Sequence, residues 1–169
     1  MILLAKNNTG YHNLVKLVSE SHVDNYYYRP RTTFEMLERY SEGVIATSAC
    51  IAGIVQEHLR NHDFDGALEW ARKLAGIYEP GDFYIELQDQ GLSFARRSEE
   101  KNPNAEKKTQ REINQELTKI AEILGLKTIA TNDFHYLVQE DAYAQDIMLC
   151  IGCLLYTSDA ADDLTRVDL

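Results

Sequence analysis

The sequence predicts an α/β fold in which helices cover a parallel sheet. Four short apolar runs without proline, at residues 2–5, 44–47, 83–87 and 128–131, have the length of buried strands. Longer amphipathic stretches separate these runs, and this alternation is typical of βα units. The chain has 169 residues, of which 44% are hydrophobic and 26% are charged, so it is long enough and apolar enough for one core.

The segments between the predicted strands carry helix signals. A first helix is expected after the turn-prone residues 7–10. Thr32 and Glu35 fit a capping box at the start of the next helix, and Asp63 is expected to cap the long helix that follows it. Gly125 is placed to end a later helix as its C-cap.

One polar segment and one further regular element are expected in the later part of the chain. Residues 98–108 are almost wholly polar, which predicts a solvated loop or a frayed helix start. The last regular element is expected at residues 139–151.

The segment 153–169 has no apolar periodicity that would bury it. Its opening, Cys-Leu-Leu-Tyr-Thr-Ser-Asp-Ala-Ala-Asp, is what a transposon-based sequencing adapter encodes in one frame, and its closing Val-Asp-Leu continues that frame. We therefore expect residues 1–152 to form a single domain portion and residues 153–169 to be a non-native tail.

The charge and cysteine content restrict the partners and the compartment. A net charge of −10 argues against a surface that neutralises phosphates, so we expect no direct nucleic-acid surface on this chain. The three cysteines, Cys50, Cys150 and Cys153, are too few for a disulfide framework, which favours a reducing cytoplasm. The apolar run at residues 2–5 is far shorter than a signal-peptide core or a membrane span, so no membrane association is expected.

Candidate metal ligands follow two of the predicted strands. Asp133 and His135 come just after the strand 128–131, at the end where α/β folds bind ligands. Alternate residues of extended chain point to the same side, so this carboxylate and imidazole can reach one cation. The alternatives are a turn or helix cap for Asp133 and a hydrogen-bonded surface histidine for His135. Cys50 follows the strand 44–47 and reads as a buried apolar residue unless a second strand end supplies ligands, as Asp133 and His135 do.

Glu86 and the tyrosine-rich run at residues 26–31 each have two interpretations. Glu86 lies inside the strand 83–87, where a carboxylate either faces outward or pairs with something in the site. Residues 26–31 read Tyr-Tyr-Tyr-Arg-Pro-Arg, a composition that can stack on bases. At a single place on an acidic chain, we expect this run to pack against a neighbouring element instead.

Five blocks of sequence carry a resemblance to a known family. They read LLAKNNTGY at 3–11, YRPR at 28–31, SACIAG at 48–53, FYIELQD at 83–89 and ATNDFHY at 130–136. In this order they resemble the amino-terminal PHP (polymerase and histidinol phosphatase) domain of bacterial DNA polymerase III alpha subunits.

The resemblance implies a distorted β/α barrel, truncated here at both ends, whose strand ends bind a cluster of divalent metals such as zinc. Cys50, Asp133 and His135 match three of the metal positions, and the family's opening His-x-His ligands match no part of the chain. The expected metal site is therefore incomplete. Some family members use this domain as a 3′-5′ proofreading exonuclease.

The same resemblance makes the parent a DNA-directed DNA polymerase with DNA and other replicase subunits as partners. The catalytic aspartates of the polymerase palm match nothing in this chain, so we expect no catalytic residues and no polymerase activity from it alone. Two alternatives stay open at this point. One is a structural PHP module without metal activity, and the other is a free-standing phosphoesterase of the histidinol-phosphatase type.

Overall fold

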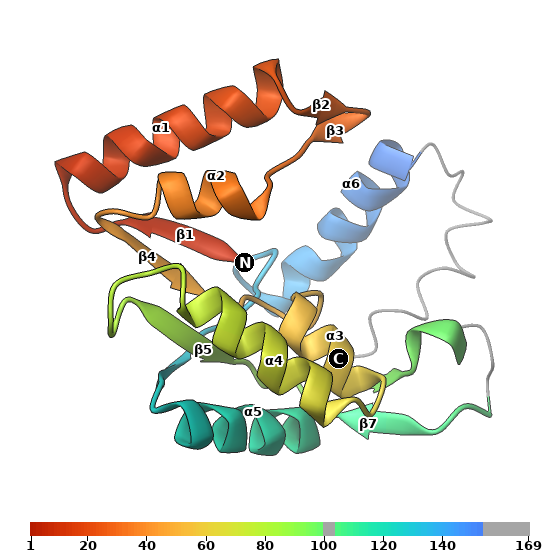
Figure 1. Ribbon diagram of the computed structural model, residues 1–169. Coiled ribbons are helices and arrows are strands. Elements are labelled where there is room, and N and C mark those ends of the chain that lie inside the picture. Colours follow the sequence, from red (N-terminus) through yellow and green to blue (C-terminus); the bar gives the residue numbers. More distant parts are fainter. Residues whose placement is uncertain (100–103, 154–169) are drawn as a thin grey trace.

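The computed structural model describes residues 1–99 and 104–153, and Figure 1 shows how their helices and strands are arranged. In chain order, the elements are β1 (Ile2–Ala5), α1 (Asn8–Val23), β2 (Tyr26–Tyr27), β3 (Arg29–Pro30), α2 (Phe34–Arg39), β4 (Val44–Thr47), α3 (Ile54–Arg60), α4 (Phe64–Ala75), β5 (Phe83–Leu87), β6 (Ser93–Ala95), η1 (Arg97–Glu99), β7 (Lys107–Thr109), α5 (Gln110–Leu124), β8 (Lys127–Ala130), η2 (Gln139–Asp141) and α6 (Ala142–Cys153).

The main sheet of the described residues has the strand order β1-β4-β5-β8. Strands β4, β5 and β8 run parallel, as predicted, and β8 begins and ends one residue earlier than predicted. Strand β1 is antiparallel to β4, so the expectation of a wholly parallel sheet is wrong at this edge. An apolar run reports burial and not strand direction, so the sequence pattern carried no signal for this reversal. The sheet is open, with β1 and β8 at its edges, in agreement with the predicted α/β fold and a partial β/α barrel.

The core lies between β4 and β5 and the helices α3, α4 and α5. Fully buried aliphatic and aromatic side chains of this kind each contribute roughly 1.5–3 kcal/mol relative to exposure. The strand residues that take part are Val44, Ala46, Phe83 and Ile85, and their helical partners are Val55, Leu59, Ala67, Ala71, Leu74, Ile113, Leu117, Ile120 and Ala121.

The two edge strands are far more exposed than the apolar runs predicted. Ile2 and Leu4 of β1 are 45% and 52% exposed, and Ile129 of β8 is 40% exposed. Each edge strand has a neighbour on one side only, and these side chains lie on the sheet face opposite the core helices. The prediction that all four runs are buried strands is therefore right for β4 and β5 and wrong for β1 and β8.

The helix starts follow local capping chemistry. The Asn7 side chain accepts a hydrogen bond from the third residue of α1, and Asp63 caps α4 as predicted. The cap of α2 is Thr33, so the assignment of Thr32 to that role was one residue early. Gly125 ends α5 in the left-handed conformation with φ of +64°, as its placement after an apolar helix predicted.

Helix α1 is positioned against β4 by a contact between two glycines. A Cβ atom on Gly10 would lie 1.8 Å from the carbonyl oxygen of Gly43, so only glycine permits this approach. The same carbonyl accepts a hydrogen bond of 2.8 Å from the backbone N–H of Lys6. The helix and the edge strand are therefore held to one point at the start of β4.

The polar segment at 98–108 is more ordered at its end than the sequence indicated. Strand β7 pairs with β6, and Lys108 is only 8% exposed. The Lys108 ammonium donates a hydrogen bond of 3.0 Å to the carbonyl of Leu59 and pairs with the carboxylate of Glu116. Residues 100–103 of the predicted loop lie outside the described residues.

The β2–β3 ribbon and the carboxyl-terminal part of the chain differ in how well they match the prediction. The ribbon lies beside α1, as the expected packing against a neighbouring element requires, but its tyrosines stay 59%, 60% and 80% exposed. The element predicted at 139–151 is present as η2 followed by α6. Of the expected tail 153–169, all but Cys153, which ends α6, lies outside the described residues. No helix in the described part is long and apolar enough to cross a membrane.

Candidate functional site at the strand ends

The candidate site lies at the carboxyl ends of β4, β5 and β8. These strands are parallel neighbours in that order, so their carboxyl ends meet at one edge of the sheet. The residues that follow them are 48–50, 88–90 and 131–135. Every residue that the sequence predicted as a metal ligand therefore belongs to this edge.

Glu86 connects the three strands beneath the site. Its side chain is buried, and one carboxylate oxygen accepts a hydrogen bond of 2.5 Å from the Thr47 hydroxyl of β4. The other oxygen accepts from the hydroxyl of Thr131, which follows β8, and from the Gln88 amide at 3.1 Å. Of the two interpretations of Glu86, the outward-facing one is wrong, and the carboxylate is buried with hydrogen-bond partners. No described cation pairs with it, so neutral donors alone compensate its burial.

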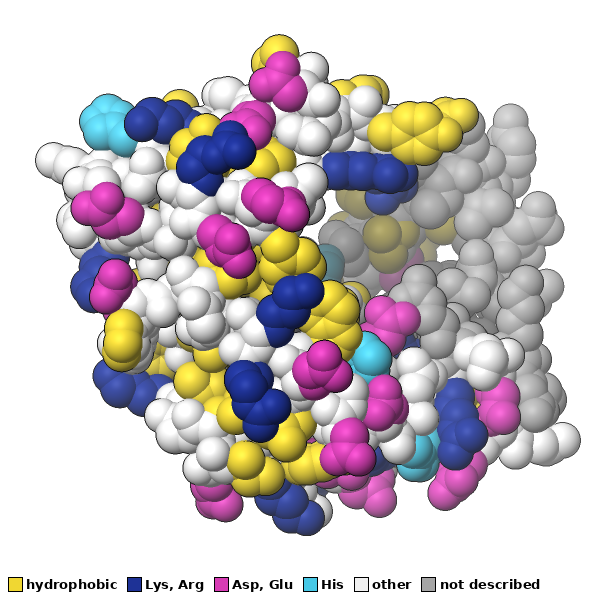
Figure 2. Space-filling model, viewed as in Figure 1, with side chains coloured by type: hydrophobic (Ala, Val, Ile, Leu, Met, Phe, Trp, Pro, Cys, Tyr) yellow, Lys and Arg dark blue, Asp and Glu magenta, His cyan; other side chains and the backbone are white. Residues whose placement is uncertain are grey.

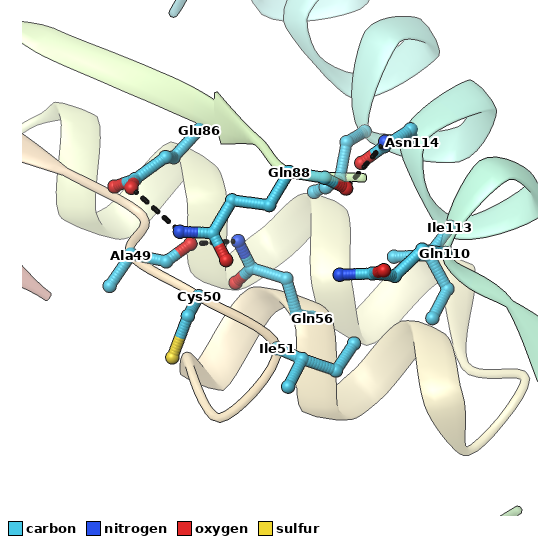
Figure 3. A pocket seen from close by; sticks show the side chains of 10 residues that line it. Ala49, Cys50, Ile51, Gln56, Glu86, Gln88, Gln110, Ile113 and Asn114 are labelled. Carbon is cyan, nitrogen blue, oxygen red and sulfur yellow. Dashed lines mark hydrogen bonds between the residues drawn. The ribbon is translucent and has the colours of Figure 1, made fainter. Parts of the chain in front are cut away.

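A small cavity of about 10 Å³ opens beside this network, and Figure 3 shows its lining. Gln56 of α3 donates to the Ser48 hydroxyl at 2.9 Å and to the Ala49 carbonyl at 2.8 Å. The Gln56 side-chain oxygen is buried without a hydrogen-bond partner among the described residues. Ala49 has a φ of +61°, a strained conformation for a residue with a side chain. Gln56 thus helps to hold the loop after β4 in an unusual shape, together with the hydrogen bond from the Glu86 backbone N–H to the Ser48 hydroxyl.

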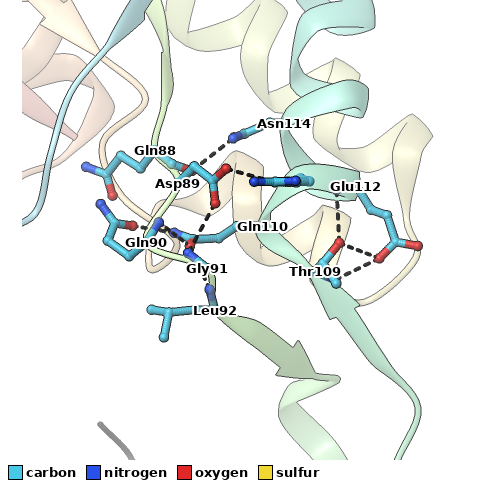
Figure 4. A network of polar contacts seen from close by, with 10 residues as sticks. Gln88, Asp89, Gln90, Gly91, Leu92, Thr109, Gln110, Glu112 and Asn114 are labelled. Carbon is cyan, nitrogen blue, oxygen red and sulfur yellow. Dashed lines mark hydrogen bonds and ion pairs between the residues drawn. The ribbon is translucent and has the colours of Figure 1, made fainter. Parts of the chain in front are cut away.

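Carboxamide side chains from the turn after β5 and from α5 form one wall of the site, as Figure 4 shows. This wall consists of Gln88, Gln90, Gln110 and Asn114. The Gln110 side-chain oxygen accepts from the backbone N–H groups of Gln90 and Leu92, at 2.8 and 3.1 Å. The Gln90 amide donates to the Asn132 side chain at 3.1 Å, and Asn114 donates to the Gln88 carbonyl at 2.9 Å. These bonds attach the turn after β5 both to α5 and to the loop that carries Asp133.

Asp133 and His135 line one large cleft of about 900 Å³ between this wall and α6. The Nδ1 atom of His135 lies 3.0 Å from the Asp133 backbone carbonyl. If Nδ1 carries the proton, it donates to this carbonyl and leaves the lone pair of Nε2 for a ligand, which is the usual arrangement of a metal-binding histidine. The structure therefore brings two of the three predicted ligands to the same cleft.

Cys50 is placed differently. It lines the small cavity and not the large cleft, although Gln88 and Gln110 border both spaces. Figure 3 shows its sulfur directed away from Glu86 and Gln88. Across the described parts of the chain, no three Cys, His, Asp or Glu side chains come together closely enough to hold one ion. The three-residue ligand set accordingly stays a prediction.

Sequence reasoning missed two carboxylates at the cleft. Asp146 of α6 lines it. A search for ligands at strand ends gives no signal for this residue, because it lies on a helix on the other side of the cleft. Asp89 also lines it, and a hydrogen bond from the backbone N–H of Gly91 holds the pKa of Asp89 below its ordinary value. The Arg111 guanidinium, 3.0 Å away, lowers this pKa further. Asp89 is therefore already paired with a guanidinium, whereas Asp146 adds a second carboxylate to the lining of the cleft.

An α/β sheet with polar side chains gathered at the carboxyl ends of its parallel strands defines the class of protein, and comparison with known families agrees. The family model described as PHP domain matches residues 1–90, more than half of the chain, so the chain belongs to the PHP domain family.

The relatives found among curated proteins are DNA polymerase III alpha subunits. The chain is 42% identical to that of Borreliella burgdorferi over 162 residues and 39% identical to that of Treponema pallidum over 159 residues, each match covering 94% of the chain. It is 34% identical to that of Aquifex aeolicus over 151 residues, or 89% of the chain. The chain spans 12% of the length of each of these relatives. The resemblance drawn from the five sequence blocks is confirmed.

Proposed function

We propose that the chain is part of the PHP domain of a bacterial replicative DNA polymerase and that it binds divalent metal ions at the strand ends. Asp133 and His135 are assigned to one ion, and Cys50 to a neighbouring ion of the same cluster. The observation that carries this proposal is the shared cleft of Asp133 and His135 at the carboxyl end of β8, with the His135 ring oriented by a backbone carbonyl.

The donor set fits a divalent transition metal in kind, although not in number. PHP domains generally bind divalent metals, and carboxylate, imidazole and thiolate groups together suit zinc or a similar ion. Zinc sites normally take three or four protein ligands, so this chain supplies an incomplete site. Asp146 also lines the cleft, and its carboxylate is a further candidate ligand. A bound ion would polarise a phosphodiester and lower the pKa of a coordinated water.

The activity of the longer relatives sets the expected context. DNA-directed DNA polymerisation is the activity of the longer relatives, and the chain spans only 12% of their length. We therefore expect no polymerase activity from the chain itself. A metal site beside a large cleft fits a 3′-5′ exonuclease activity in the longer protein, with DNA and other replicase subunits as partners. A cytoplasmic location follows from this role.

One alternative has an observation in its favour. In the described residues no three candidate ligands gather around one point, which is what a structural PHP module without metal would present. The buried Glu86 network would then serve only to join three strands. A free-standing phosphoesterase is less well supported, because the relatives at 34–42% identity are polymerase subunits.

Cobalt titration of the 169-residue chain tests the proposal. Calorimetry measures binding, and the absorption of a thiolate-to-cobalt charge-transfer band reports whether a cysteine is a ligand. We expect weak binding in the unaltered chain and the loss of one binding step in Asp133→Ala and in His135→Ala. Asp65→Ala and His12→Ala remove the same groups from exposed helical positions and serve as matched controls.

Cys50→Ala separates the two proposed ions. It should abolish the charge-transfer band and leave the binding step of Asp133 and His135 in place. Binding that persists unchanged in both Asp133→Ala and His135→Ala would refute the site. No binding of cobalt or zinc by any form of the chain would favour the structural module.

A further inference from the structure

The β2–β3 ribbon is an exposed aromatic and basic surface on an acidic chain. Tyr26, Tyr27 and Tyr28 are 59%, 60% and 80% exposed. Residues 25–33 contain two arginines and no Asp or Glu, although the whole chain has a net charge of −10. Figure 2 shows apolar and basic side chains next to one another where Figure 1 places the ribbon, beyond the end of α1.

The arginines of this ribbon are available to an anion. The Arg31 guanidinium carbon lies 4.7 Å from the centre of the Tyr27 ring. A guanidinium stacked in this way keeps its in-plane N–H groups free, and these match the oxygens of a phosphate. Neither Arg29 nor Arg31 forms an ion pair with any residue that the structure describes.

The tip of the ribbon holds a tyrosine in a strained conformation. Tyr28 joins the two strands with a φ of +58°, a region that large side chains rarely adopt. Its ring meets that of Tyr27 edge-on, with the centroids 4.6 Å apart. Strain of this kind persists where the rest of the structure fixes the position, and it is concentrated at functional sites. The ribbon thus holds its tyrosine rings at the protein surface.

We propose that residues 26–31 bind single-stranded nucleic acid, with bases stacking on the tyrosine rings and backbone phosphates bound by Arg29 and Arg31. An acidic protein segment would satisfy the two guanidinium groups but would leave the exposed ring faces unused. Unpaired bases use both features, because every base has a flat face and a phosphate beside it. This surface is separate from the proposed metal site and does not depend on it.

Fluorescence anisotropy of a labelled twelve-residue oligothymidylate, titrated with the 169-residue chain at several salt concentrations, tests the proposal. Two phosphate contacts predict a slope of roughly −1.4 for log K against log salt. The Arg29→Gln/Arg31→Gln double variant should bring this slope close to zero. Replacing Tyr26, which is 59% exposed, with leucine should weaken binding by at least about fivefold, since one stacked base is lost.

The control is a second double variant, Arg72→Gln/Lys119→Gln, which removes the same charge from exposed positions on α4 and α5. It should bind the oligonucleotide as the unaltered chain does. Equal weakening by both double variants would reveal unspecific charge attraction and overturn the proposal. So would the absence of any binding by the unaltered chain, or binding of the unaltered chain that none of the ribbon variants weakens. Circular dichroism spectra of all variants should coincide, because every altered side chain is at the surface.

Discussion

Removal of the Glu86 carboxylate should disturb the strand ends more than any exposed charge. The side chain is 2% exposed and accepts hydrogen bonds from Thr47, Thr131 and Gln88, which belong to or follow three different strands. Glu86→Ala would leave these donors without their acceptor and would open a cavity between the strands. The fold should therefore lose stability, and the loop that carries Asp133 should become less well fixed.

The size of the effect follows from the burial of each donor. Thr47 is 5% exposed, so its unsatisfied hydroxyl costs about 2 kcal/mol. Thr131 and Gln88 are only half-buried, and water can replace the lost bond at a cost of about 0.5 kcal/mol each. We expect Glu86→Ala to lower the free energy of unfolding by about 3 kcal/mol. Glu86→Gln keeps an acceptor for Thr131 and can donate to a rotated Thr47 hydroxyl, so it should cost only about 1 kcal/mol.

Urea denaturation followed by circular dichroism measures these differences, with an unchanged m-value as the condition for comparing midpoints. Glu69→Ala, which removes an exposed carboxylate from α4, is the matched control and should stay within about 0.5 kcal/mol of the unaltered chain. If Glu86→Ala were as stable as this control, the carboxylate would not be holding the strands together.

Two further predictions concern the framework. Gly10→Ala should destabilise the chain by about 3 kcal/mol through its clash with the Gly43 carbonyl. Gly76→Ala, with no atom nearer than 3.5 Å and a φ of −69°, should be tolerated or stabilise it by about 0.5 kcal/mol. Urea midpoints should separate the two, and equal midpoints would refute the close approach. The pKa of Asp63 is lowered below its ordinary value of 3.8, first by the backbone N–H of Gly66 and then by His58. Its contribution is therefore present above about pH 4 and lost as the pH falls through the lower folded value, so Asp63→Ala should flatten the acid limb of stability against pH.

Local patterns in the sequence predicted those elements whose determinants are local. Strands β4 and β5 have the predicted bounds because short apolar runs flanked by turn residues specify them. Asp63 and Gly125 cap their helices because capping depends on a few adjacent backbone groups. The same reasoning missed the cap of α2 by one residue, since Thr32 and Thr33 carry the same hydroxyl.

Features that depend on distant contacts could not be predicted in this way. Lys108 appears in a polar stretch, yet it is buried because Leu59 and Glu116 supply partners for its ammonium. Strand β1 is antiparallel to β4 because of the path that the chain takes between the two strands. An apolar pattern carries no information about that path. Glu86 could be marked as an unusual residue in a strand, but its partners Thr47 and Thr131 are 39 and 45 residues away in the chain.

The candidate site shows the same limit, with a consequence for its chemistry. The strand-end rule placed Cys50, Asp133 and His135 at one edge, but it could not give the strand order, in which β5 lies between β4 and β8. The ends of β4 and β8 are therefore two inter-strand spacings apart, about 10 Å. Zinc binds its ligands at about 2.0–2.3 Å, and two-metal sites hold their ions about 3.5–4 Å apart. For the proposed site, a pair of neighbouring ions would fit this separation more easily than a single ion, with Cys50 serving one and the Asp133–His135 pair the other. The polar side chains that follow β5, Gln88 above all, border both spaces and would lie between the two ions.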